Sequence, residues 1–209
     1  MATDKYLEVE LRYKIPDVEA CLVRLKGLGV TVARTDHLID DWYEPVAIKS
    51  LAEQRDWFDN QKGIAWRIRR SGEPGRERME VTSKQLTDDN NHNSFHETTA
   101  KFASYDEAAR AMVEKNYRNW LTVDKTRYYL TSTNPQIKDD EFELVIDHIA
   151  GLKEKIGVGA CLEIERKGSE SREQALKRIE IIAGLLGFSA EDQFEMSLTV
   201  TSMSALARF

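Results

Sequence analysis

The stretch YLEVELRYK, residues 6–14, alternates apolar and charged side chains without a break. Its apolar positions are Leu7, Val9, Leu11 and Tyr13, and its charged positions are Glu8, Glu10, Arg12 and Lys14. A period of two predicts a β-strand with one apolar face and one charged face. A strand that simply faces solvent rarely carries two acids and then two bases. We therefore expect the charged face to meet other ionic groups.

The same kind of charged face recurs along the chain. Polar and charged residues spaced by two in predicted strands are Arg67 and Arg69, Glu80 with Thr82 and Lys84, Lys125 and Arg127, and Glu163 and Glu165. Asp147 is a single acid opposite apolar neighbours. The solvated side of a sheet explains any one of these strands. It explains poorly why acids and bases recur in pairs. If the sheet curls into a barrel, these faces line a polar, charged interior.

The overall pattern predicts one α+β domain with an antiparallel sheet. Eight strand-like segments and a few amphipathic helices are joined mostly by short connections.

The chain has 209 residues and a net charge of −6, which does not favour nucleic-acid binding. No apolar run is long enough to span a membrane, and residues 1–10 lack the pattern of a secretory signal. With only two cysteines, Cys21 and Cys161, we expect buried thiols and a cytoplasmic location.

A charged interior of this composition indicates a particular chemistry. Buried charges need ionic partners or a metal. Arginine can bind phosphate through two parallel hydrogen bonds, and carboxylates two apart on a strand can hold hard divalent cations through oxygen. Both are needed when a phosphoanhydride bond is broken with the help of a metal.

Six segments of the chain resemble, in order, the motifs of the CYTH domain, also called the triphosphate tunnel metalloenzyme fold. The stretch EVELRYK resembles the family's E-x-E-x-K signature, and the other matching segments are WRIRR, VTSK, VDKTRYYL, VIDHIAGL and CLEIE. The resemblance implies an eight-stranded antiparallel β-barrel, or tunnel, flanked by helices. It implies a single domain over residues 1–209, with core motifs in 6–166 and a C-terminal helical segment at 171–209.

The resemblance also implies site residues and a metal cofactor, Mg²⁺ or Mn²⁺, bound as two ions. The implied metal ligands are Glu8, Glu10, Asp147, Glu163 and Glu165. The implied substrate-binding bases are Arg12, Lys14, Arg67, Arg69, Lys84, Lys125 and Arg127, and the implied catalytic set is Glu8, Glu10, Arg12 and Lys14. Glu97 falls where family members often carry an acid on the fifth strand.

Two positions depart from the family pattern. Arg12 replaces the signature lysine, which keeps the charge but puts a planar fork where the family has a compact ammonium. Arginine is also a poor general base because its pKa is too high, so Lys14 on the same face is the candidate to compensate. Near the C-terminus, Ser197-Leu198 stands where the family has a Ser-Tyr pair.

The function implied by the resemblance is metal-dependent hydrolysis of a linear small-molecule triphosphate: inorganic triphosphate, thiamine triphosphate or a nucleoside triphosphate. One alternative is a class IV adenylyl cyclase that makes cyclic AMP and pyrophosphate from ATP, because His148 beside Asp147 resembles the DH pair of those enzymes. Another is a non-catalytic polyphosphate- or nucleotide-binding module, which the repulsion among four retained glutamates opposes. We expect no nucleic-acid or membrane partner; a homodimer is compatible with the sequence but not required by it.

Overall fold

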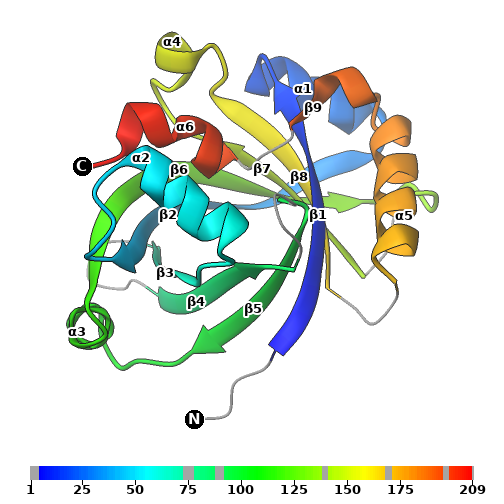
Figure 1. Ribbon diagram of the computed structural model, residues 1–209. Coiled ribbons are helices and arrows are strands. Elements are labelled where there is room, and N and C mark those ends of the chain that lie inside the picture. Colours follow the sequence, from blue (N-terminus) through cyan, green and yellow to red (C-terminus); the bar gives the residue numbers. More distant parts are fainter. Residues whose placement is uncertain are drawn as a thin grey trace. The chain divides into compact units, whose positions relative to one another are not determined.

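The computed structural model describes residues 5–72, 78–87, 92–137, 141–167, 171–194 and 198–208 (Figure 1). Its strands are β1 (Lys5–Ile15), β2 (Val30–Pro45), β3 (Ala65–Ser71), β4 (Arg78–Leu86), β5 (Ser94–Ala100), β6 (Tyr117–Ser132), β7 (Phe142–His148), β8 (Ala160–Lys167) and β9 (Gln193–Phe194). Its helices are α1 (Val18–Gly27), α2 (Leu51–Arg55), the π-helix η1 (Asp56–Asn60), α3 (Tyr105–Glu114), α4 (Lys153–Ile156), α5 (Arg172–Leu185), the 3₁₀-helix η2 (Ala190–Asp192) and α6 (Leu198–Leu206). None of these helices is long and apolar enough to cross a membrane.

The strands form one antiparallel sheet whose order closes on itself. The hydrogen-bonded order is β5-β4-β3-β2-β6-β7-β8-β1-β9, and β5 also pairs with β1. This confirms the predicted α+β class and the antiparallel barrel of eight main strands. The ninth strand has two residues and pairs with Arg12 and Tyr13 of β1. It lies inside the segment 171–209, which was predicted to be helical and otherwise contains α5, η2 and α6.

The chain divides into two compact units, which are described separately. The first unit comprises Met1–Leu7, His37–Asp124 and Met203–Phe209, and the second comprises Glu8–Asp36 and Lys125–Ser202. The strands β3, β4 and β5 belong to the first unit, and β7, β8 and β9 belong to the second. The longer strands β1, β2 and β6 contribute residues to both.

One hydrophobic core cluster of the first unit lies between α3 and one face of β2, β3 and β4. Ala108 and Met112 of α3 pack with Tyr43, Ile68 and Val81 of the three strands. Ser104 begins α3, since its side chain accepts a hydrogen bond from the backbone N–H of Glu107. Because side chains alternate along a strand, the neighbours of these apolar residues point to the opposite face of the sheet.

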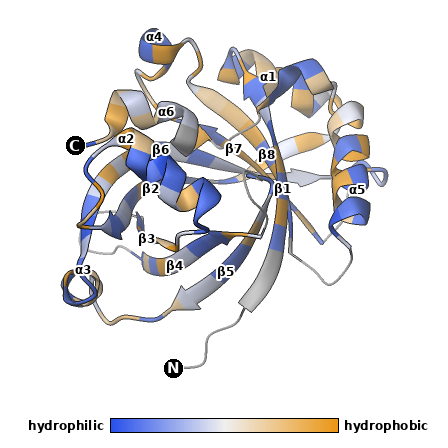
Figure 2. Cartoon of the chain, in the orientation of Figure 1, coloured by the Kyte–Doolittle hydropathy of each residue, from blue (hydrophilic) through white to orange (hydrophobic). Residues whose placement is uncertain are grey.

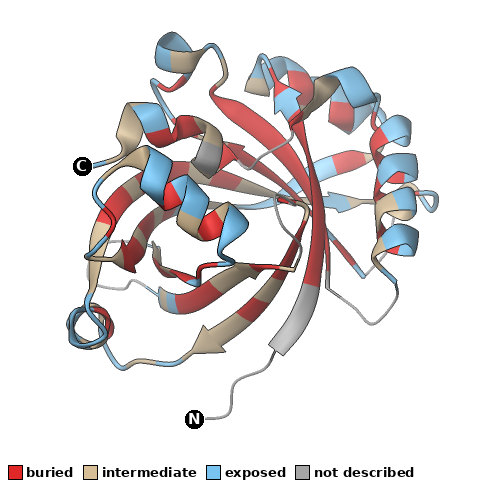
Figure 3. Ribbon diagram, in the orientation of Figure 1, coloured by how far each residue is buried: buried red, intermediate tan, exposed pale blue. Residues whose placement is uncertain are grey.

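The second unit buries both faces of its central strands. Leu11 pairs in register with Ile164, and both are buried on the apolar face. The helix α5 packs beside β8, and its residues Ile179 and Ile182 are buried. Hydrophilic and hydrophobic residues alternate along α5 in Figure 2. Figure 3 shows that β1 and β8 are buried along most of their described length. At Glu8, Glu10 and Arg12 the charged face of the YLEVELRYK strand is therefore buried and not a solvated surface.

Candidate functional site

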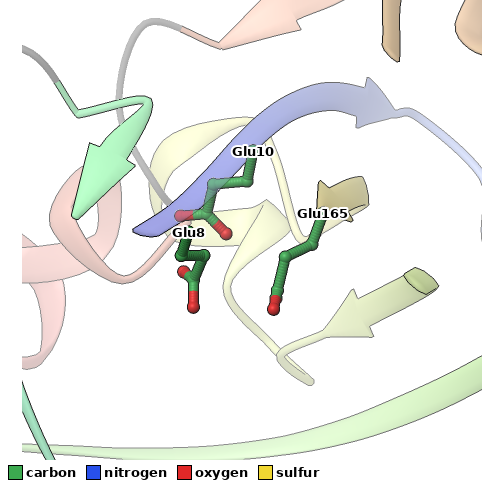
Figure 4. A group of neighbouring side chains, drawn as sticks. All are labelled: Glu8, Glu10 and Glu165. Atoms are coloured by element: carbon green, nitrogen blue, oxygen red, sulfur yellow. The ribbon is translucent and has the colours of Figure 1, made fainter. Parts of the chain in front are cut away.

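Three glutamates meet on the charged face of the second unit. Glu8 and Glu10 are two apart on β1, so their side chains share a face, and Glu10 pairs in register with Glu165 of β8. One carboxylate oxygen from each lies within 4.8 Å of the others. Figure 4 shows the three carboxylates turned toward a common point, and all three residues are buried. We call Glu8, Glu10 and Glu165 the acidic triad.

The two bases of β6 are held by an aspartate of β7. Lys125 Nζ lies 2.5 Å from Asp147 Oδ2, and Arg127 donates to both oxygens of Asp147 from Nε and Nη2, at 2.6 and 2.7 Å. Burial alone would raise the pKa of Asp147, but Arg127 and Lys125 outweigh it and hold the pKa well below its usual range. The carboxylate therefore stays charged and orients both bases.

Arg12 lies between the acidic triad and a second acid of β8. Its guanidinium contacts Glu10, and its Nε lies 3.8 Å from Glu163 Oε1. Glu163 Oε2 in turn accepts from Arg127 Nη2 at 2.9 Å. The Arg12 side chain has 0% exposure. Burial lowers the pKa of Arg12, although Glu163 and other nearby carboxylates oppose that shift. A continuous row of alternating charges thus runs from the acidic triad to Asp147 and Lys125.

Carboxylates outnumber bases among the described buried residues on this face of the second unit. Its described buried ionic side chains are the five carboxylates of Glu8, Glu10, Asp147, Glu163 and Glu165 and the three bases Arg12, Lys125 and Arg127. Neighbouring buried carboxylates repel one another and a cation between them offsets that repulsion, and oxygen ligands are those that Mg²⁺ and Mn²⁺ prefer. The residues present therefore fit a hard divalent cation at the acidic triad.

In the first unit, the predicted bases of β3 and β4 are also held by carboxylates. Arg67 Nη2 lies 3.2 Å from Glu80 Oε1 and 3.4 Å from Thr82 Oγ1. Lys84 Nζ lies 2.6 Å from Glu97 Oε1, and the two residues pair in register across β4 and β5. Burial would raise the pKa of Glu80, but Arg67 and Arg69 outweigh it and lower the pKa.

One acid on this face was not expected from the sequence. Asp40 of β2 accepts two hydrogen bonds from Arg69, from Nε at 2.6 Å and from Nη2 at 2.8 Å. The neighbouring Asp41 points to the other face and accepts from Arg70 Nη2 at 2.9 Å. The only sequence signal is a DD pair at 40–41 and an RR pair at 69–70. Nothing local shows that these pairs lie opposite each other in the sheet.

Several residues singled out in the sequence lie away from these clusters. Lys14 is exposed, and its Nζ sits 5.6 Å from the centre of the Phe194 ring. His148 lies on the opposite face of β7 from Asp147 and lines a pocket of about 250 Å³ together with Lys153. Ser197 is outside the described residues, whereas Leu198 is buried at the start of α6.

The two thiols and the histidines His37 and His92 have identifiable surroundings. Cys21 and Cys161 are free and buried, as predicted. His37 pairs with Asp124 at 2.6 Å on an exposed surface, and the buried His92 lies 2.9 Å from an aspartate of η1. Both histidines thus take part in contacts within the first unit, away from the acidic triad.

A sequence model of the CYTH domain matches residues 6–197 of the chain. The chain belongs to the CYTH domain family. This CYTH domain resembles a conserved hypothetical protein from Pyrococcus furiosus, with 21% identity over 92% of this chain and 98% of that chain and a TM-score of 0.65. It also resembles a Vibrio parahaemolyticus protein provisionally named an adenylate cyclase, with 18% identity over 94% and 97% of the two chains and a TM-score of 0.68. A protein from Pyrococcus horikoshii has 18% identity over 95% and 99% of the chains and a TM-score of 0.70.

At these identities the likeness to solved structures of CYTH relatives shows the fold alone. Curated protein sequences gave no match to this CYTH domain.

Proposed function

We propose that this CYTH domain is a phosphohydrolase that acts on a linear triphosphate with the help of a divalent cation. Inorganic triphosphate, thiamine triphosphate and nucleoside triphosphates form the candidate substrate class. The observation that carries the proposal is the buried acidic triad, with its oxygens within 4.8 Å of one another, on the face that also carries Lys125 and Arg127. Carboxylates that gather a cation beside bases that bind phosphate are the parts a metal-assisted phosphoryl transfer requires.

Glu8, Glu10 and Glu165 would hold the cation, Mg²⁺ or Mn²⁺. When bound, such an ion polarises phosphate oxygens or an attacking water. The close approach of the three carboxylate oxygens supports one ion at the triad. Asp147 and Glu163, the other predicted metal ligands, accept hydrogen bonds from Arg127. Their contacts favour a role in holding the bases, so we assign them to that role in the proposed site.

Lys125 and Arg127 would bind the phosphate chain in the second unit. Because Asp147 fixes both bases, their positions do not need to be organised when the anion arrives, and this preorganisation favours binding. Arg67, Arg69 and Lys84 of the first unit are held by carboxylates in the same way, and we include them among the phosphate-binding residues. Arg12, with no exposed surface, is assigned to charge compensation between Glu10 and Glu163.

The test is to incubate the purified protein with inorganic triphosphate, thiamine triphosphate and ATP, each with Mg²⁺ or Mn²⁺. Phosphate, pyrophosphate and cyclic AMP are measured separately. Release of phosphate supports hydrolysis. Pyrophosphate together with cyclic AMP from ATP would replace the proposal by cyclisation, and binding without turnover would favour the non-catalytic module.

A pair of matched variants identifies the site. Glu10→Gln removes one charge from the acidic triad, and we expect metal-dependent turnover to be lost while the fold is kept. Glu154→Gln is the control, since Glu154 is an exposed residue of α4 in the same unit. Equal activity of Glu10→Gln and wild-type protein would remove Glu10 from the site.

A further inference from the structure

Two neighbouring aspartates of β2 hold two neighbouring arginines of β3 on opposite faces of the first unit. Asp40 pairs in register with Arg69 and accepts from its Nε and Nη2, whereas Asp41 accepts from Arg70. The Asp40 side chain is 1% exposed and that of Arg69 is 11% exposed. Both pairs connect the same two strands, so they differ mainly in the face on which they lie.

The Asp41 pair belongs to the packing beneath α3. Tyr105 of α3 donates to Asp41 Oδ2 at 3.0 Å, and Thr122 of β6 donates to Asp41 Oδ1 at 2.7 Å. The guanidinium of Arg70 also lies 4.7 Å from the centre of the Tyr105 ring. This network fastens a helix to the sheet and contains none of the proposed phosphate-binding bases.

The Asp40 pair lies on the face of those bases. Arg69 pairs in register with Glu80 of β4, and Arg67, two residues away on β3, points to the same side. Glu80 itself is ion-paired with Arg67, and Arg67 and Arg69 together lower its pKa, so a neighbouring carboxylate already balances part of their charge. Asp40 is therefore not the only carboxylate that compensates the charge of Arg69.

We propose that Asp40 is a positioning residue for triphosphate binding, which fixes the guanidinium plane of Arg69. This inference rests on the proposed function. An arginine side chain has several rotatable bonds, and two parallel hydrogen bonds restrict it to one orientation. Asp40 occupies the Nε–Nη2 edge of the fork. An anion then approaches the guanidinium from its Nη1 side, in an orientation set before binding.

Because Asp40 is charged, the proposal predicts a definite direction for the change in triphosphate affinity when Asp40 is replaced. A carboxylate beside Arg69 weakens the attraction of any anion by Coulomb's law. If Asp40 acted only through its charge, replacing it by the neutral asparagine would tighten triphosphate binding. If it positions Arg69, the same change weakens binding, because an asparagine side chain cannot offer two acceptors to the fork. The two readings predict opposite results from one variant.

The experiment measures the affinity of Asp40→Asn, Asp41→Asn and wild-type protein for inorganic triphosphate with Mg²⁺ by titration calorimetry, with thermal unfolding in parallel. We expect Asp40→Asn to bind roughly tenfold more weakly, about 1.4 kcal/mol, and to raise KM more than it lowers kcat. Asp41→Asn should lower the unfolding temperature and leave the affinity unchanged. In an Arg69→Met background, Asp40→Asn should have no further effect on affinity.

Unchanged or tighter binding by folded Asp40→Asn would overturn the inference while leaving the proposed function intact. Additive effects of Asp40→Asn and Arg69→Met would overturn it as well. If Asp40→Asn does not fold, Arg69→Lys replaces it, since lysine keeps the charge but cannot form the paired contact; wild-type affinity would then overturn the inference. Failure of wild-type protein to bind triphosphate at all would overturn the proposed function and this inference together.

Discussion

Arg127 and Asp147 form a two-point contact between β6 and β7, from Nε to Oδ1 at 2.6 Å and from Nη2 to Oδ2 at 2.7 Å. The two residues pair in register, and both are buried. Lys125 approaches the same carboxylate. One acid thus holds two bases that the sequence analysis assigned to phosphate. The contact therefore contributes both to the stability of the second unit and to the proposed binding of phosphate.

Asp147→Asn should therefore destabilise the protein. It leaves Lys125 and Arg127 with less compensation in a buried place, and loss of one member of a buried ion pair costs about 3–5 kcal/mol. Urea unfolding at pH 7 measures the change. Asp124→Asn is the control, because the Asp124 side chain is 67% exposed and pairs with His37 at the surface. We expect the control to change the free energy of unfolding by less than about 1 kcal/mol.

The same contact makes the free energy of unfolding depend on pH in the acidic range. Asp147 has a lower pKa in the folded protein than in the unfolded chain, so its contribution to stability is present above the unfolded pKa and is lost as pH falls toward the folded pKa. Wild-type protein should lose free energy of unfolding below about pH 4 more steeply than Asp147→Asn does. If the free energy of unfolding of the two proteins fell with the same slope in this pH range, the acid dependence could not be assigned to Asp147.

Arg12 offers a second comparison, because it stands where the family signature has lysine. Its side chain has 0% exposure and lies between Glu10 and Glu163. Arg12→Met leaves two buried carboxylates without their shared base, and we expect a loss of about 3 kcal/mol in urea unfolding. Arg12→Lys keeps the charge but not the fork, so it should cost less. Arg55→Met, at an exposed position of α2, serves as the control. Equal losses for Arg12→Lys and Arg12→Met would show that shape, not charge, holds the two carboxylates.

The sequence predicted the strands well because alternation with a period of two is a local property. The stretch at 6–14 and the segments containing Arg67, Lys125 and Glu163 all form strands of the antiparallel barrel. The acidic triad could be expected from the same reasoning, since Glu8 and Glu10 share a face and the family order brings Glu165 beside them. Local pattern and motif order together were sufficient for these elements.

The partners of the bases could not be predicted in the same way. Asp40 and Arg69 are 29 residues apart, and their contact depends on the register between β2 and β3. The full burial of Arg12 likewise depends on which acids of β8 lie opposite it. The two-residue strand β9 and the π-helix η1 are too short and irregular to leave a periodic signal. Register and tertiary packing, which no single segment encodes, decided these features.

Glu44 should give the protein a second, opposite dependence on pH. Burial raises its pKa from 4.5 to about 7, although Arg118, whose Nη2 lies 3.2 Å from Glu44 Oε1, counteracts the shift. The folded protein therefore retains a proton that the unfolded chain releases, and the free energy of unfolding falls as pH rises from about 4.5 to about 7. Glu44→Gln should remove this slope in urea unfolding curves recorded across the interval. An unchanged slope would mean that Glu44 is already ionised throughout.

Divalent cations should stabilise the protein through the acidic triad. A ligand that binds only the folded state adds about 2.7 kcal/mol at one hundred times its dissociation constant, so Mn²⁺ should raise the midpoint of thermal unfolding. Glu8→Gln removes one of three charges whose oxygens lie within 4.8 Å. Without metal this variant should be no less stable than wild type, because like-charge repulsion is reduced. With Mn²⁺ it should show little or no increase in the midpoint. Glu154→Gln should respond to Mn²⁺ as the wild type does, and a full response by Glu8→Gln would place the cation elsewhere.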